Sequence, residues 1–81
     1  MKPKHPHCLA FGRAVRKYRC ELGLSQEALA DQAKIHRTYV GGIERGERNP
    51  TLTTICRLSS VLHVLPEDLL RETRRLEEPI K

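Results

Sequence analysis

Residues 22–50 read LGLSQEALADQAKIHRTYVGGIERGERNP, and two short helical patterns in this stretch decide the fold. Ser25 is a favourable N-cap for the first pattern, and Glu27 in its opening turn suits the positive end of a helix dipole. The segment DQAKIH then has the character of a tight bend. Gly46 is placed to end the second pattern. The stretch therefore predicts two short helices joined by about three or four residues.

The flanking sequence continues the helical pattern on both sides. Apolar residues recur at helical spacing at Phe11, Val15, Tyr18 and Leu22 before the stretch, and at Leu52, Ile55, Leu58 and Leu62 after it. Either Asn49 followed by Pro50, or Thr51, can open the fourth helix, and Pro66 can open a fifth. We expect helices at 9–22, 25–33, 37–45, 51–62 and 66–76, a flexible basic arm at 1–8 and a frayed tail at 77–81.

Length and composition limit the chain to one small all-α domain. Eighty-one residues suffice for a single core, no segment alternates with the period of a strand, and 31% of the residues are charged. No apolar run approaches the roughly 20 residues of a membrane span, and the N-terminus lacks the apolar region of a signal peptide. We therefore expect a cytoplasmic protein without a membrane partner.

The positive charge is concentrated in the first part of the chain. The net charge is +5, and ten basic residues stand against five acidic ones through Arg48, whereas five of each follow from Asn49 onward. A local basic excess favours a polyanionic partner. Together with the two short helices and the arginine at the start of the second, it predicts a helix-turn-helix DNA reader.

The cysteines and histidines predict neither a disulfide framework nor a cofactor site. Cys8, Cys20 and Cys56 form no C-x-x-C pair, and we expect them to be buried free thiols. His5, His7 and Cys8 are chemically suited to a metal, but we expect a proline-rich arm without one, which could instead lie along DNA. No arrangement of nucleophile and base indicates an enzyme.

Residues 22–70 resemble the helix-turn-helix family of Cro and the phage repressors, also called the xenobiotic-response-element family. The matching segments are LGLSQEALADQAKI, HRTYVGGIERGERNPTL and LSSVLHVLPEDLL, which cover more than half of the chain. Within the family, RTYVGGIERGERNP looks most like the small controller proteins of restriction-modification systems. The resemblance implies a compact five-helix domain of the lambda-repressor type, whose second paired helix enters the major groove.

The resemblance also implies roles for individual residues. Arg37, Thr38 and Tyr39 would contact bases, and the chemistry agrees, because arginine can bond bidentately to guanine and threonine suits the methyl group of thymine. The residues implied to contact phosphate are Gln26, Arg45, Arg48 and Asn49. An ion pair between Arg19 and Glu44 is implied as a structural link.

Gly41 and Gly42 lie within the expected recognition helix, where glycine costs about 1 kcal/mol relative to alanine. At about 100° per residue they lie opposite Val40 and Ile43, which define the buried side. We interpret both glycines as groove-facing backbone that allows the helix to approach the bases closely.

Three positions depart from the family's pattern. Lys34 stands where the turn usually has glycine, His36 stands at the cap of the recognition helix, and Leu65 stands at the cap of the fifth helix. A non-glycine residue in left-handed space costs about 1–2 kcal/mol. We therefore expect modest stability in the same fold.

The sequence thus predicts a transcriptional regulator that binds double-stranded DNA sequence-specifically, as a homodimer on a two-fold related operator. Candidates for the dimer surface are Leu65, Leu69, Leu70 and Leu76. The alternative is an antitoxin-like or adaptor module that uses the same fold to bind another protein. We expect no cofactor and no small-molecule ligand.

Overall fold

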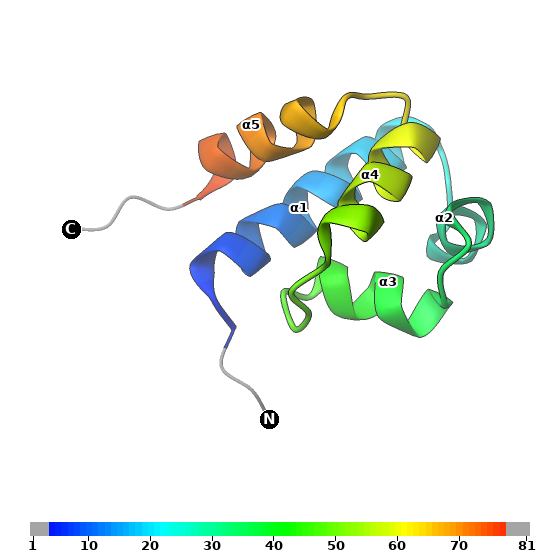
Figure 1. Cartoon of the computed structure of the whole chain (residues 1–81), viewed down its shortest axis with the longest axis horizontal. Helices are drawn as coiled ribbons and strands as arrows, with labels where there is room; N and C mark the ends of the chain where they lie inside the picture. The colour runs from blue at the N-terminus through cyan, green and yellow to red at the C-terminus, as the bar shows by residue number, and fades with distance from the viewer. Residues whose placement is uncertain (1–3, 78–81) are drawn as a thin grey trace.

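The helices of the protein are arranged around α1 (Figure 1). The computed structural model describes residues 4–77, and over this range the predicted all-α class is confirmed. The helices are α1 (Pro6–Glu21), α2 (Gln26–Ala33), α3 (Arg37–Glu44), α4 (Leu52–Val61) and α5 (Pro66–Leu76). α1 packs against α5 and α3, while α2 packs against α3 and α4. The helix-turn-helix pair, α2 and α3, therefore rests on α1 and α4.

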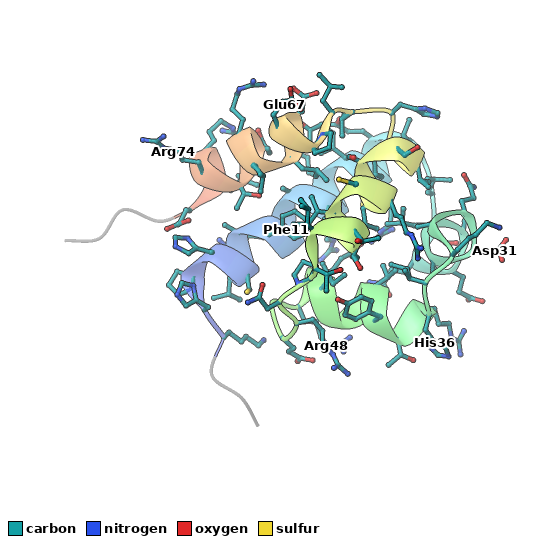
Figure 2. All side chains as sticks on the ribbon, viewed as in Figure 1. Phe11, Asp31, His36, Arg48, Glu67 and Arg74 are labelled. Atoms are coloured by element: carbon teal, nitrogen blue, oxygen red, sulfur yellow. The ribbon has the colours of Figure 1, made fainter. Side chains whose placement is uncertain are left out.

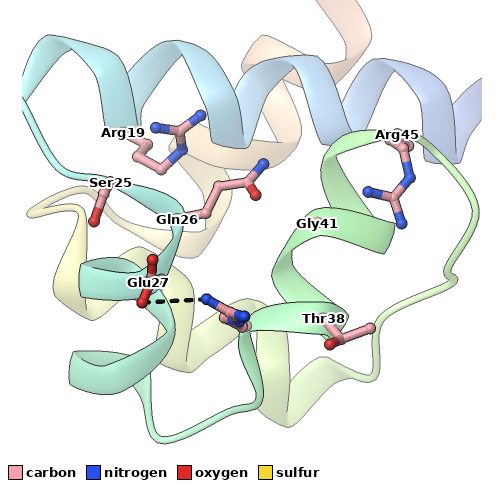
Figure 3. A pocket seen from close by; sticks show the side chains of 8 residues that line it. Arg19, Ser25, Gln26, Glu27, Thr38, Gly41 and Arg45 are labelled. Carbon is pink, nitrogen blue, oxygen red and sulfur yellow. Dashed lines mark ion pairs between the residues drawn. The ribbon is translucent and has the colours of Figure 1, made fainter.

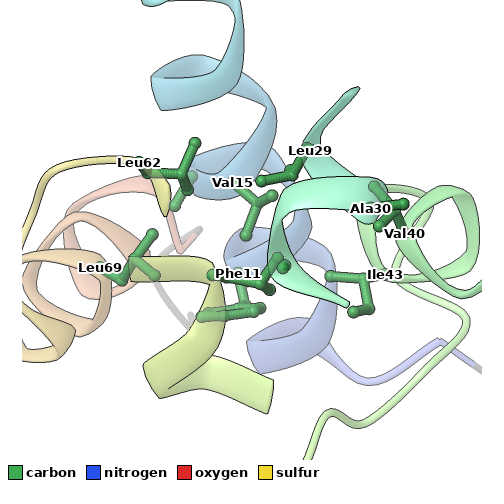
Figure 4. Close-up of a cluster of buried hydrophobic side chains, with 11 residues drawn as sticks. Phe11, Val15, Leu29, Ala30, Val40, Ile43, Leu62 and Leu69 are labelled. Atoms are coloured by element: carbon green, nitrogen blue, oxygen red, sulfur yellow. The ribbon is translucent and has the colours of Figure 1, made fainter. Parts of the chain in front are cut away.

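Every helix contributes to one aliphatic core (Figure 4). The fully buried side chains include Val15 from α1, Leu29 from α2, Val40 and Ile43 from α3, Leu58 from α4 and Leu69 from α5. Burial of such a side chain stabilises the fold by about 1.5–3 kcal/mol. Because α3 is anchored through Val40 and Ile43, its opposite side is turned outward.

α1 begins at Pro6, earlier than the expected start at Leu9. Proline suits a first helical position because its missing N–H would have no partner there. The ring of His5 caps the helix by accepting a hydrogen bond of 3.1 Å from the N–H of His7. The expectation of a flexible arm over residues 1–8 is therefore wrong from Pro6 onward.

The two ends of the chain are only partly described. Residues 1–3 and 78–81 lie outside the described range, and with them the start of the expected arm and most of the expected tail. Glu77, the first residue of the expected tail, is the C-cap of α5 and contacts the ring of His7 at 2.6 Å. The described part of the tail is thus held against the start of α1.

The bend between α2 and α3 places Lys34 in the left-handed conformation, with φ 59° and ψ 44°. The N–H of Ile35 donates to the carbonyl of Ala30 at 3.0 Å and closes the end of α2. His36 then caps α3, because its Nδ1 accepts a hydrogen bond of 3.1 Å from the N–H of Thr38. A non-glycine residue therefore does occupy the strained turn position, and histidine does serve as the cap.

The alternatives for the start of α4 are resolved in favour of Thr51. Its side chain accepts a hydrogen bond of 3.2 Å from the N–H of Thr54, whereas Asn49 precedes the helix in the loop. Leu65 cannot cap α5 with its own side chain. Asp68 compensates by accepting a hydrogen bond of 2.8 Å from the N–H of Leu65.

Four leucines do not lie where the sequence analysis placed them. Leu52 is 74% exposed, because it lies about 120° round the helix from the inward Leu58. Leu22 is the C-cap of α1 and is exposed beyond the core. Leu69, a candidate for the dimer surface, is fully buried, and Leu76 packs against the core.

The expectation of buried thiols is wrong for two of the three cysteines. Cys8 is half-buried, but Cys20 and Cys56 are exposed, and all three are free. Cys20 lies about 140° round α1 from the inward Val15, and Cys56 lies about 160° round α4 from the inward Leu58. Helix geometry therefore turns both thiols toward solvent.

An ion pair between Arg19 and Glu44 joins α1 to the end of α3. Nε and Nη2 of Arg19 donate to the two carboxylate oxygens at 2.6 and 2.9 Å, and Nη1 donates to the carbonyl of Leu24 at 2.8 Å. Both charged side chains are largely buried. The hydrogen bonds to Glu44 raise the pKa of Arg19 above its ordinary value. The pair implied by the family resemblance is confirmed.

Gly12 allows the end of α3 to lie directly against α1. A Cβ at this position would overlap the carbonyl oxygen of Ile43 and lie 2.7 Å from that of Glu44. Both are backbone atoms in a packed helix, so they have little room to move. Glycine at this position sets how closely the two helices approach.

A second charged cluster joins α1 to α5. Lys17 donates to Glu72 at 2.8 Å, and Arg75 donates to both carboxylate oxygens of Glu72 at 3.0 and 2.6 Å. The hydrogen bonds from Arg75, and then from Lys17, lower the pKa of Glu72 from 4.5 to about 2. This carboxylate is therefore bound as the anion at neutral pH.

We expect Gly12→Ala to lower the free energy of unfolding by about 1–3 kcal/mol, because the added methyl group overlaps the backbone of α3. Gly41→Ala is the matched control, since its methyl group would meet only the ends of the Arg45 and Gln26 side chains. Alanine is the better helix former, so the control should be as stable as the parent or more stable. Urea unfolding followed by circular dichroism measures both, and equal stability of Gly12→Ala and the parent would contradict the close approach.

We expect Arg19→Met to lower the free energy of unfolding by about 3 kcal/mol, because it leaves the carboxylate of Glu44 buried without its partner. Arg71→Met is the control, since the pair of Arg71 with Asp68 is exposed and should contribute little. The same urea titration compares them. Equally small effects of the two substitutions would show that the Arg19 pair does not hold α3.

Because the folded-state pKa of Glu72 is depressed, its contribution to stability is present above pH 4.5 and is lost as the pH falls toward about 2. Glu72→Gln removes this titration. We therefore expect the variant to lose less stability than the parent over that pH interval. Thermal unfolding at a series of pH values tests this, and parallel curves for the two proteins would mean that the pKa is not depressed.

Candidate nucleic-acid interface

A groove separates the start of α2 from the outward side of α3 (Figure 3). It has a volume of about 510 Å³ and is lined by Arg19, Ser25, Gln26, Glu27, Arg37, Thr38, Gly41 and Arg45. We call this groove and its continuation along α3 the arginine face, defined by Gln26, Glu27, Arg37, Thr38, Gly41, Gly42, Arg45, Arg48 and Asn49. Of the residues singled out from the sequence, Gln26, Arg37, Thr38, Gly41 and Arg45 line the groove itself.

Arg37 and Thr38 occupy the first turn of α3 with exposed side chains. Nη1 of Arg37 lies 3.3 Å from Oε2 of Glu27 across the groove (Figure 3). The N–H of Thr38 is engaged by the cap, His36, which fixes the start of the helix. The first turn of α3 therefore presents a guanidinium group and a hydroxyl group to solvent, at the end of a helix that the core holds in place.

Gln26 connects the groove to the buried ion pair beneath it. It is the first residue of α2 and is half-buried. Its Nε2 donates to Oε1 of Glu44 at 3.0 Å, and its own oxygen remains at the groove beside Gly41. The sequence indicated Gln26 as an interface residue but did not indicate this hydrogen bond, because the partner lies on another helix.

Gly41 and Gly42 lie on the outward side of α3, but two arginine side chains cover them. A Cβ on Gly41 would lie 3.0 Å from Nη1 of Arg45, and a Cβ on Gly42 would lie 2.8 Å from Cγ of Arg48. The room left by the missing side chains is therefore taken by Arg45 and Arg48, which fold back across the helix. The glycine backbone is reachable from outside only when these side chains move.

The far end of α3 and the loop after it carry Arg45, Arg48 and Asn49, of which Figure 2 labels Arg48. Nε of Arg45 lies 3.1 Å from Oε1 of Glu47. The guanidinium of Arg48 lies 6.0 Å from the ring centre of Tyr39, at the limit of a cation–π contact. Tyr39 itself is half-buried against the core, and Asn49 is exposed in the loop. The ring of Tyr39 therefore lies between the core and the guanidinium of Arg48.

Two acidic residues accompany these arginines, and sequence reasoning did not identify either as a partner. Glu27 faces Arg37, and Glu47 faces Arg45. Neither pair has the i,i+3 or i,i+4 spacing that marks neighbours on one helix. Two arginines of the arginine face, Arg37 and Arg45, are therefore paired with acids.

A metal centre and a membrane span are both absent from the part of the chain that the structure describes. No group of three or more His, Cys, Asp or Glu side chains in residues 4–77 is placed to hold a metal ion, and this includes the His5, His7 and Cys8 cluster. In the same range, no helix combines the length and the apolar character needed to cross a membrane.

Comparisons with known proteins agree with the motif formed by α2 and α3. Residues 15–69 match the family model described as Helix-turn-helix. Control protein C.BamHI of Bacillus amyloliquefaciens is 48% identical over 63 residues, which are 76% of this chain and 78% of that protein.

Two solved structures share the arrangement of helices. The restriction-modification controller protein C.AhdI from Aeromonas hydrophila has a TM-score of 0.79 and 42% identity, over 80% of this chain and 98% of that one. The biofilm regulator SinR in complex with DNA has a TM-score of 0.72 and 34% identity, over 74% of this chain and 97% of that one. With α2 and α3 in the same arrangement and a family model spanning more than half of its length, the chain belongs to the helix-turn-helix family.

Proposed function

We propose that the protein is a transcriptional regulator that binds double-stranded DNA sequence-specifically and acts by binding alone. The observation that carries this is the arginine face, which gathers Arg37, Arg45 and Arg48 along the outward side and end of α3. An outward helix face with arginines at both ends fits a major groove, where side chains meet base edges and flanking phosphates. Among its relatives, C.BamHI is a control protein and SinR has been solved in complex with DNA.

The residues divide into two roles in this proposal. Arg37 and Thr38 contact bases, since they stand at the exposed first turn of α3, and Tyr39 supports them from its half-buried position. Phosphate contacts are assigned to Gln26, Arg45, Arg48 and Asn49. Nε2 of Gln26 gives one of its two N–H donors to Glu44, so a contact to phosphate falls to the second donor.

Gly41 and Gly42 can allow close approach to the bases only after the arginine side chains that cover them have moved. Arg45 and Arg48 cover Gly41 and Gly42 in the free protein, and both arginines are exposed. When these arginines extend toward phosphates, they uncover the glycine backbone at the same time. Close approach of α3 to the bases and phosphate binding at its far end are therefore coupled steps in this proposal.

We further propose that the protein acts as a homodimer on a two-fold related operator. A single domain of this size makes few base contacts, and two copies about one helical turn apart supply more. Leu70 on α5 and Leu65 at its N-cap are exposed, so they remain candidates for the dimer surface, whereas Leu69 is buried in the core and Leu76 packs against it.

The competing proposal is an antitoxin-like or adaptor module that binds another protein. The exposed leucines, with Leu52 on α4 among them, favour it. It leaves the basic excess and the arginine face without a role, which is why we prefer the DNA-binding function. Salt dependence separates the two, because a protein with several phosphate contacts must lose DNA affinity steeply as salt rises.

Random-site selection with the purified protein at moderate salt tests the proposal. We expect an enriched motif with two related half-sites. We expect Arg37→Ala to lose preference at one position in each half-site, by about 1–3 kcal/mol of discrimination, because a bidentate base contact is removed. Arg48→Ala should weaken binding to all sequences alike, because a phosphate contact carries no base information.

Fluorescence anisotropy with the selected operator and its single-base variants measures both effects. No enriched motif would refute the regulator. Equal loss of base preference in the two variants would refute the division of roles between Arg37 and Arg48.

A further inference from the structure

The proposed base reader, Arg37, has an acidic partner in the free protein. Oε2 of Glu27 lies 3.3 Å from Nη1 of Arg37, and the pair spans the groove between α2 and α3 (Figure 3). Glu27 is not part of the buried ion-pair network, which uses Glu44 instead. Its carboxylate therefore stands on the arginine face itself, beside the residues proposed to contact DNA.

The ion pair between Arg37 and Glu27 is weak enough to be retained or broken, depending on which group of the DNA Arg37 contacts. The side chains of Arg37 and Glu27 are 65% and 73% exposed, and ion pairs with this exposure contribute little to stability. An arginine has five N–H donors, and a bidentate contact to guanine uses two of them. Arg37 can thus bond to a base while Glu27 still holds its other edge.

A phosphate in place of a base changes this balance. A phosphate competes with Glu27 for the same guanidinium, and its negative charge is brought close to the carboxylate. Like charges at such distances repel each other, most strongly at low salt. Random DNA offers Arg37 mainly phosphates, whereas an operator offers it a base edge.

From this geometry we propose that Glu27 is a specificity-determining residue, which holds Arg37 for a base and opposes its binding to phosphate. This inference rests on the proposed function and refines it. Glu27 acts as a positioning residue through Arg37, and its carboxylate lowers affinity for random DNA more than affinity for the operator. The acid on the face is then part of sequence discrimination.

The favourable interaction of an acid with the positive end of a helix dipole would also account for Glu27. The chain contains a control for that effect. Glu67 is the second residue of α5, as Glu27 is the second residue of α2. Both are exposed acids in the first turn of a helix. Glu67 lies on the far side of the molecule from α3, so it shares the local helix effect and lacks the contact to Arg37 (Figures 1 and 2).

The test compares Glu27→Gln with Glu67→Gln in binding to the selected operator and to a random duplex of the same length. We expect Glu27→Gln to bind random DNA more tightly and to lower the ratio of operator to random affinity by about tenfold, the size of one base contact. Glu67→Gln should leave this ratio within about twofold of the parent value. Thermal unfolding should be altered equally by the two substitutions, because both remove one acid from a first helical turn.

A second comparison places Glu27→Gln in the Arg37→Ala background. If Glu27 acts through Arg37, the substitution should no longer change the affinity ratio there. An unchanged ratio for Glu27→Gln alone, or the same fall in both backgrounds, would overturn the inference. If the parent protein shows no preference for the operator over random DNA, the proposed function itself fails. If the parent shows the preference and Glu27→Gln retains it in full, only the inference about Glu27 fails.

Discussion

The carboxylate of Glu44 is the point at which three helices meet. Arg19 from α1 binds both of its oxygens, and Gln26 from α2 donates to one of them, while Glu44 itself ends α3. A carboxylate buried this deeply would be costly if any of these donors were missing, because its desolvation must be balanced by hydrogen bonds. The network therefore favours one arrangement of α1, α2 and α3. Gly12 then lets the end of α3 lie against α1 at the distance that the network requires.

The arginine face depends on this arrangement. Its residues come from α2, α3 and the loop that follows, so the groove exists only while the two helices keep their relative position. Gln26 belongs to both levels, with one end on the buried carboxylate and the other at the groove. A change in the contacts of the arginine face can therefore affect the buried ion pair of Arg19 and Glu44 through the side chain of Gln26. The exposed pairs of Arg37 and Arg45 are weak by comparison, which allows the outer layer to rearrange while the inner one stays fixed.

The joint between α2 and α3 shows that packing outweighs local preference. Lys34 is held in a left-handed conformation that costs a non-glycine residue about 1–2 kcal/mol. On either side of it, Leu29 and Val40 are fully buried, and burial of one such side chain offsets a cost of this size. In a short helix pair, most of the stability comes from the buried faces, because isolated helices of this length are marginal. Packing thus holds the turn in a conformation that its own residues do not favour.

The sequence by itself determined the number and order of the helices, the inward residues of α2 and α3, the strained turn and the ion pair implied by the family resemblance. These follow from periodicity, caps and a motif whose parts are close together along the chain, so local information suffices. It failed for Leu52, Cys20 and Cys56, because the buried sector of a helix is set by what packs on it. Only the tertiary structure decided that Arg45 and Arg48 cover the glycines, that Gln26 binds Glu44, and that Glu27 faces Arg37. Each of these contacts depends on how separate segments of backbone approach one another, and sequence spacing carries no measure of that distance.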